Sequence, residues 1–169
     1  MTAPTLTGDR VTLRALEEPD RTRLREILAE PSVARVWGSE PADEAADDLF
    51  EPYHTAWAIV VDGVIAGSIQ AYEEDEPDYR HAGIDLFLDA AHQRSGLGPE
   101  AIRLVARYLF AERGHHRLTI DPAASNTAAI RAYERVGFRP VGVMRRYERG
   151  RDGTWHDGLL MDMLEGELR

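Results

Sequence analysis

The sequence of 169 residues contains no cysteine. This absence excludes a disulfide framework, a catalytic thiolate and a zinc site built on cysteine ligands. It also fits a reducing compartment, and we expect the protein to be cytoplasmic. Long apolar runs are missing as well, because no stretch approaches the roughly 20 residues that span a bilayer. We therefore expect no membrane association, and the first ten residues lack the pattern of a signal peptide.

Positive charge is in short supply. The chain has 20 Lys and Arg against 30 Asp and Glu, which gives a formal net charge of −10. No nucleic-acid partner is expected, because affinity for phosphates comes mainly from Lys and Arg. A negative field would attract a small cationic substrate, although an acidic surface also serves solubility alone. The choice between a monomer and a homodimer stays open.

The apolar pattern predicts a single α/β (α+β) domain over residues 1–169 with a mixed sheet. Strands are expected at residues 7–15, 58–61, 64–71, 83–88, 118–120, 138–146 and 159–164, and helices at 17–30, 43–50, 99–112 and 126–136. Asp62-Gly63 is typical of a tight turn between two strands. No internal repeat or linker interrupts this order.

A glycine-containing loop, Gln93-Arg94-Ser95-Gly96-Leu97-Gly98, lies between a predicted strand and a predicted helix. Small residues allow close approach of the backbone to a ligand, and a helix N-terminus presents unpaired N–H groups with partial positive charge. The loop therefore predicts a site for a phosphate or pyrophosphate, with a plain turn as the alternative. It is neither a Walker loop nor a complete dinucleotide fingerprint.

Together with this loop, Asn126 at a helix start and Tyr133-Glu134-Arg135-Val136-Gly137-Phe138 at its end resemble the acetyl-CoA signature of GNAT N-acetyltransferases. Gly83–Leu88 and Thr119–Pro122 are similar to the aminoglycoside 6′-N-acetyltransferases, and ribosomal-protein N-terminal acetyltransferases are next nearest. The resemblance implies a mostly antiparallel sheet flanked by helices, with acetyl-CoA as cosubstrate.

The resemblance also implies which residues bind the cosubstrate. The whole loop Gln93, Arg94, Ser95, Gly96, Leu97 and Gly98 would hold the pyrophosphate, the backbone of Phe87 and Leu88 would pair with the pantetheine amides, and Asn126 would hydrogen-bond the same arm. Asn126 is also a good N-cap. Ser95 and Pro99 depart from the family pattern, and Pro99 removes one amide from the helix entrance, so the resemblance leaves the number of phosphate contacts open.

Amine acetylation requires removal of a proton from the ammonium, polarisation of the thioester and protonation of the departing thiolate. None of these steps requires a metal ion. Tyr133 is the candidate acid, and its alternative role is packing. Asp85 lies inside an apolar strand, where a carboxylate is costly unless it faces a cleft or solvent. The resemblance implies that it is the base or ammonium anchor, and a solvated face is its alternative. Asp121 is a second carboxylate for a cationic substrate, or a turn cap.

The acceptor pocket is expected to include Glu73, Trp57 and Tyr72. Glu73 opens an acidic run, residues 73–78, which is either an acidic wall for an amine-rich ligand or a solvated loop. Trp37, Tyr53, Trp57 and Tyr72 are pocket aromatics or ordinary core residues. His115 and His116 have no acidic partner at helical spacing and are interpreted as a surface turn.

The resulting hypothesis is an enzyme that acetylates a small cationic amine, with the 6′-amine of an aminoglycoside as the leading acceptor. Acetylation of a protein or peptide N-terminus is the nearest alternative. A non-catalytic acyl-CoA-binding module is the other class, but it would have no need of both Asp85 and Tyr133.

Overall fold

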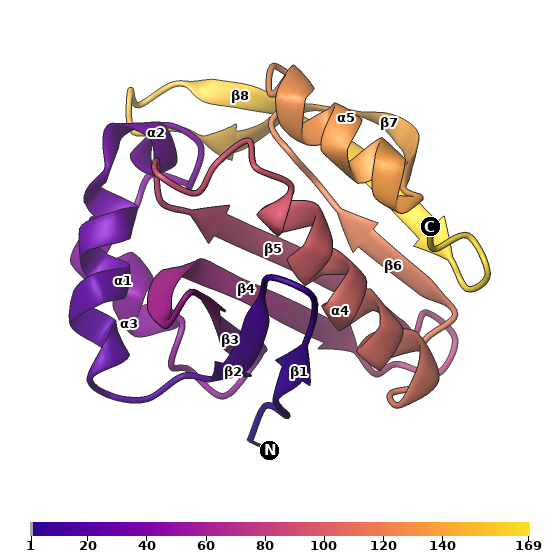
Figure 1. The fold of residues 1–169 in the computed structure, drawn as a ribbon. Coiled ribbons are helices and arrows are strands. Elements are labelled where there is room, and N and C mark those ends of the chain that lie inside the picture. The colour runs from indigo at the N-terminus through magenta and orange to yellow at the C-terminus, as the bar shows by residue number, and fades with distance from the viewer. Residues whose placement is uncertain (1) are drawn as a thin grey trace.

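The structure, a computed structural model, describes residues 2–169. One eight-stranded sheet runs in the order β1-β2-β3-β4-β5-β6-β8-β7 (Figure 1). Its strands are β1 (Leu6–Thr7), β2 (Thr12–Ala15), β3 (Thr55–Val61), β4 (Val64–Glu74), β5 (His81–Leu88), β6 (Arg117–Ile120), β7 (Arg139–Arg149) and β8 (Trp155–Leu164). Only the β5–β6 pair is parallel. The predicted mixed, mostly antiparallel sheet flanked by helices is confirmed.

Helices cover both faces of the sheet. Helices α4 (Leu97–Ala111) and α5 (Thr127–Val136) lie on one face (Figure 1). Three shorter helices, α1 (Asp20–Ala29), α2 (Pro31–Ala34) and α3 (Ala42–Asp48), supply a second core cluster. Pro31 ends α1, as expected, but also begins α2, because proline is well suited to the first position of a helix.

Alternation along β5 decides which side chains face which helices. Ile84 belongs to the large core cluster, and Leu86 packs against it under α4. Phe87 belongs to the second cluster with α1, α2 and α3. Because neighbouring side chains on a strand point to opposite faces, Asp85 shares the face of Phe87. The candidate base therefore points away from α4.

Strands β5 and β6 pair over a short length and then separate. Their paired residues are Ala82 with Leu118 and Gly83 with Thr119, although β5 continues to Leu88. Figure 1 shows the two strands diverging beneath α4 and α5. The edge of β5 beyond Gly83 therefore has no strand beside it, and an opening forms in the sheet.

Three local expectations differ from the structure. The first predicted strand is two short strands joined by a turn, in which the Gly8 amide donates to the Val11 carbonyl at 2.8 Å. Glu73 and Glu74 belong to β4 and not to a loop. His115 is buried, with 1% of its surface exposed, and is not part of a surface turn. Over residues 2–169, no helix has the length and apolar character needed to cross a membrane.

Candidate active site

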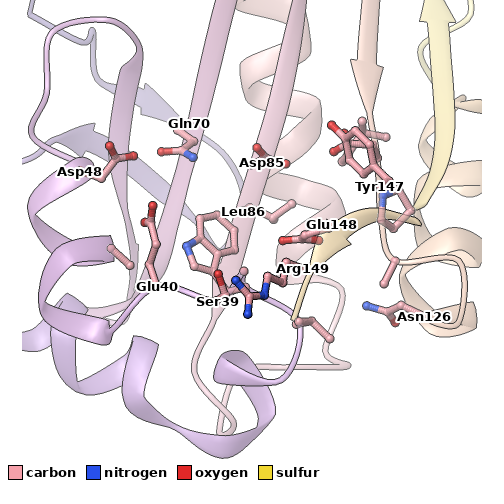
Figure 2. A pocket seen from close by; sticks show the side chains of 18 of the residues that line it. Ser39, Glu40, Asp48, Gln70, Asp85, Leu86, Asn126, Tyr147, Glu148 and Arg149 are labelled. Atoms are coloured by element: carbon pink, nitrogen blue, oxygen red, sulfur yellow. The ribbon is translucent and has the colours of Figure 1, made fainter. Parts of the chain in front are cut away.

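A cavity of about 670 Å³ lies over the opening between β5 and β6. Its lining comes from α3 and the segment before it, from β4, β5 and β6, from α5 and its N-cap, and from the β7–β8 hairpin (Figure 2). Five of the lining residues carry carboxylates: Glu40, Asp48, Asp85, Asp121 and Glu148. Arg149 is the one basic residue among those that line it. Negative charge is thus concentrated at the cavity.

Asp85 lies on β5 at the centre of this arrangement and lines the cavity, as predicted. The pKa of its carboxyl is raised to about 7, first by burial and then by the negative charges of Asp121 and Glu148, against the lowering effect of a hydrogen bond from Tyr72. A carboxyl with a pKa near neutrality can both accept and release a proton at working pH. The position and pKa of Asp85 suit a general base.

Tyr133 lies on α5 and also lines the cavity. Its ring packs against the main core, and the ring of Phe138 meets it edge-on at a centroid distance of 6.4 Å. Burial raises the pKa of its hydroxyl above the usual value, and the charges of Asp85 and Asp121 raise it further. The hydroxyl therefore keeps its proton at neutral pH, as a proton donor must.

Asp121 follows β6 on the same face as Thr119 and lines the cavity with Asp85. Its Oδ2 atom accepts a hydrogen bond of 2.6 Å from the Tyr147 hydroxyl. The carboxylate is therefore fixed by a residue of β7 rather than by the turn cap considered from the sequence. Asp121 and Asp85 also face a second cavity of about 470 Å³, which continues along the sheet.

Tyr147 and Glu148 were not predicted as site residues. An irregularity in β7 explains their position, because pairing with β8 jumps from Met144 to Glu148 and Arg146 adopts a φ of 48°. The bulge breaks the strict alternation of β7, so that Tyr147, Glu148 and the next residue, Arg149, all line the cavity. Burial, and secondarily Asp121, raises the pKa of Glu148. No signal for this bulge exists in the apolar pattern.

Of the four aromatic residues considered for the pocket, Trp37 and Tyr72 line the cavity. The prediction for Trp57 is wrong. Its side chain is fully buried in the main core, donates to the Pro4 carbonyl at 2.8 Å and packs edge-on against Tyr108. The β-alternation of β3 places this ring on the α4 face, opposite the face of Asp85. Tyr53 is 60% exposed and lines neither cavity.

Glu73 borders the second cavity, but its carboxylate is already engaged. It accepts hydrogen bonds from Arg113 at 3.1 Å and from His115 Nε2 at 2.7 Å. These partners lower the pKa of the Glu73 carboxyl against the raising effect of burial. Glu73 therefore joins β4 to the connection between α4 and β6, and this structural contact matches neither the acidic wall nor the solvated loop considered from the sequence.

The glycine loop has the geometry of an anion site at the start of α4. Gly96 is the N-cap and adopts a φ of 82°, which residues with side chains rarely adopt. Arg10 lies against the loop, and its Nη1 atom donates to the Ser95 carbonyl at 2.8 Å. A guanidinium thus lies beside the helix N-terminus, where an anion is favoured. Sequence reasoning missed Arg10 because it is 85 residues away from Ser95 along the chain.

The same loop is tied to the first helices. Gln93 donates through Nε2 to the Leu88 carbonyl at 2.8 Å and to the Ser32 hydroxyl at 3.1 Å. Ser95 donates to the His92 carbonyl at 2.6 Å. These bonds use the side chains of Gln93 and Ser95 to shape the loop, so any pyrophosphate would be bound mainly by backbone amides of Arg94 to Gly98.

The free edge of β5 suits an extended arm with amide groups. The Asp89 amide donates to the Ala66 carbonyl on β4, so the backbone of Phe87 faces β4 by alternation, whereas that of Leu86 and Leu88 faces the opening. Because the Leu88 carbonyl already accepts a hydrogen bond from Gln93, the backbone of Leu86 is the better hydrogen-bond partner for a ligand amide. The Phe87 part of the prediction is therefore wrong: its backbone pairs with β4 and its ring packs on Trp37 at 4.8 Å.

Asn126 lies at the far side of the opening and lines the cavity. Its Oδ1 atom accepts the Ala129 amide at 3.2 Å, which makes it the N-cap of α5. The side-chain amide nitrogen remains available to a ligand, so both predicted roles are compatible. Within residues 2–169, no group of three or more His, Asp or Glu has the arrangement of a metal site.

Comparison with known proteins gives these features a context. Residues 10–139 match a family described as the acetyltransferase (GNAT) domain. An aminoglycoside N(6′)-acetyltransferase type 1 from Klebsiella pneumoniae is 31% identical over 161 residues, which cover 83% of this chain and 79% of the relative. A streptothricin acetyltransferase from Streptomyces lavendulae is 27% identical over 147 residues, covering 85% and 77%.

Solved structures show the same fold. AAC(6′)-Ib in complex with paromomycin and acetyl-CoA superposes with a TM-score of 0.74 at 26% identity, covering 93% of this chain and 94% of that one. Mycobacterium smegmatis RimJ in complex with CoA-disulfide gives a TM-score of 0.85 at 21% identity, covering 98% and 89%.

Proposed function

Since the chain belongs to the GNAT family of acetyltransferases, we propose that it transfers the acetyl group of acetyl-CoA to a primary amine of a small polycationic acceptor. The 6′-amine of an aminoglycoside is the acceptor that we put first. This choice agrees with the relative from Klebsiella pneumoniae. The 1–169 chain acts as one acetyltransferase domain in this proposal.

The observation that carries the proposal is the set of five carboxylates lining one cavity. An aminoglycoside carries several ammonium groups, and each needs a partner when it leaves water. Figure 2 shows Glu40, Asp48, Asp85 and Glu148 around this cavity, and Asp121 lines it with them. Their combined field would raise the local concentration of a cationic acceptor.

Acetyl-CoA fits the remaining features of the chain. Its pyrophosphate would lie against the backbone amides of the glycine loop, beside Arg10. Its pantetheine arm would lie along the open edge of β5, near Leu86 and Asn126. Bound there, it supplies an activated thioester to the region between Asp85 and Tyr133. Leu86 and Tyr133 line the same cavity as Asp85, so in this proposal donor and acceptor meet beside the edge of β5.

Two side chains then handle the protons. Asp85 accepts a proton from the acceptor ammonium, either directly or through water, and so produces the nucleophilic amine. Tyr133 donates its phenolic proton to the departing thiolate, which its raised pKa makes possible at neutral pH. Asp121, held by Tyr147, anchors the ammonium while these transfers occur.

Thiol release from acetyl-CoA by the purified protein tests the proposal. The panel contains kanamycin and tobramycin, the polyamines spermidine and spermine, and a short peptide with a free N-terminus. The chain contains no lysine, so acetylation of its own lysine side chains cannot contribute to the signal. We expect the aminoglycosides to give the highest kcat/KM. Turnover of the peptide alone would replace this proposal with N-terminal acetylation, and turnover of the polyamines alone would replace the acceptor class.

A further inference from the structure

Gln70 is the buried polar residue of the cavity whose hydrogen bonding is incomplete. Only 3% of its surface is exposed, and it lies on β4 among the residues that line the cavity. Its Nε2 atom donates to the Tyr72 hydroxyl. Its Oε1 atom is buried and has no hydrogen-bond partner within residues 2–169. A buried carbonyl without a partner costs free energy, and such groups are uncommon in native proteins.

The position of Gln70 relates this unpaired oxygen to the chemistry. Gln70 lies directly opposite Asp85 in the antiparallel β4–β5 pair, so their side chains share one face. Side chains of such pairs have Cβ atoms about 4.5–5.5 Å apart. Figure 2 shows both side chains at the acidic cavity. A group bound to Gln70 would therefore lie within a few ångströms of the amine that Asp85 deprotonates.

The chemistry of the Gln70 amide oxygen determines which kind of ligand group it can bind. It is a neutral acceptor that requires an N–H or O–H donor. The cavity already offers five carboxylates to ammonium groups, whereas Gln70 suits an uncharged donor. Tyr72 holds the amide from its other end, so the oxygen is oriented before a ligand arrives.

We propose that Gln70 is a specificity-determining residue whose carbonyl oxygen accepts a hydrogen bond from an acceptor hydroxyl next to the reacting amine. This inference rests on the proposed function. In an aminoglycoside with a 6′-amine, the 4′-hydroxyl occupies the ring carbon adjacent to the one that bears the aminomethyl group. With the 6′-amine at Asp85, that hydroxyl would lie on the side of the neighbouring strand β4, where Gln70 is paired with Asp85.

Three related aminoglycosides test the inference. Kanamycin B has the 3′- and 4′-hydroxyls, tobramycin lacks the 3′-hydroxyl, and dibekacin lacks both. We expect kanamycin B and tobramycin to have similar kcat/KM values and dibekacin a value at least about tenfold lower, because a polar group built to bind a hydroxyl is left unpaired without it. In Gln70→Met this difference should disappear, with kanamycin B falling to the level of dibekacin.

Ser68→Ala is the matched control. Ser68 is buried on the same strand, bonds to the Trp57 carbonyl at 2.9 Å and lines neither cavity, so its loss should leave the preference intact. Thermal unfolding and CoA affinity of Gln70→Met, expected at wild-type values, check that the variant is folded.

The outcomes separate the two claims. Equal kcat/KM for all three compounds in the wild type, or a preference that survives in Gln70→Met, would overturn the role of Gln70 and leave the acetylation of aminoglycosides standing. No turnover of any of the three would show that the proposed acceptor is wrong, and the inference would fall with it.

Discussion

The Tyr147 hydroxyl donates a hydrogen bond of 2.6 Å to Oδ2 of Asp121 and thereby joins the bulge of β7 to the end of β6. Neither strand pairs with the other, since β8 lies between them. The contact orients a carboxylate that faces both cavities. It follows that the geometry of the cavities depends on a hairpin far along the chain from the candidate base.

Asp121→Asn removes the charge that we assign to anchoring an ammonium, and Tyr147→Phe removes the bond that orients it. Both changes should raise KM for the acceptor several-fold and leave kcat within about threefold, which is the pattern of lost uniform binding. Steady-state kinetics with kanamycin at saturating acetyl-CoA measures both constants. A large fall in kcat with KM unchanged would instead assign Asp121 to the chemical step.

Gly96→Val places a side chain at a φ of 82°, where its Cβ atom would also lie 3.0 Å from Arg10 Nη2. The strained loop should lose at least tenfold in CoA affinity, measured by calorimetry. Gly63→Val is the matched control, because Gly63 has a φ of 79° with no atom near its Cβ position and lines neither cavity. Wild-type affinity in Gly96→Val would show that the loop does not bind the pyrophosphate.

Tyr133→Phe keeps the ring on Phe138 and removes the proton donor. We expect kcat to fall at least about tenfold, with CoA affinity and melting temperature close to the wild type, because the lost interaction belongs to the transition state. Unchanged turnover would reduce Tyr133 to a packing residue. Kinetics and thermal unfolding of the same preparation distinguish these results.

Asp85 should also affect stability in a pH-dependent way. Its folded-state pKa of about 7 lies above the ordinary value of 3.8, so the folded protein holds this proton more tightly than the unfolded chain. Its contribution to stability is therefore present below about pH 4 and is lost as pH rises towards 7. Asp85→Asn does not titrate, so its melting temperature relative to the wild type should be higher at pH 8 than at pH 5. An equal difference at both pH values would contradict the raised pKa.

The sequence was sufficient for the fold class and for residues whose position follows from local pattern. Asp85 in an apolar strand, Asn126 at a helix start and Gly96 before α4 all occupy the places that were predicted, because alternation and capping act over a few residues. The prediction that Trp57 lines the pocket was wrong for a related reason. An aromatic ring in an alternating strand can face either side, and only the packing of Tyr108 shows which.

Residues brought together by distant pairing could not be predicted. His115 and Glu73, which bond to each other, lie 42 residues apart in the sequence. Arg10 and Ser95 of the loop lie 85 residues apart. The bulge that directs Tyr147 and Glu148 into the cavity depends on the register of β7 against β8. These features depend on the register of the sheet and on contacts between distant segments, for which one sequence gives no local signal.

The most direct test of the central claim is the product formed from kanamycin and acetyl-CoA at pH 8, identified by mass spectrometry and NMR. We predict a single acetyl group on the 6′-nitrogen, formed by the wild type and about 10²-fold more slowly by Asp85→Asn. The wild-type kcat/KM should rise with pH through about 7 as Asp85 loses its proton. Unmodified kanamycin, or equal rates for the two proteins, would contradict the account.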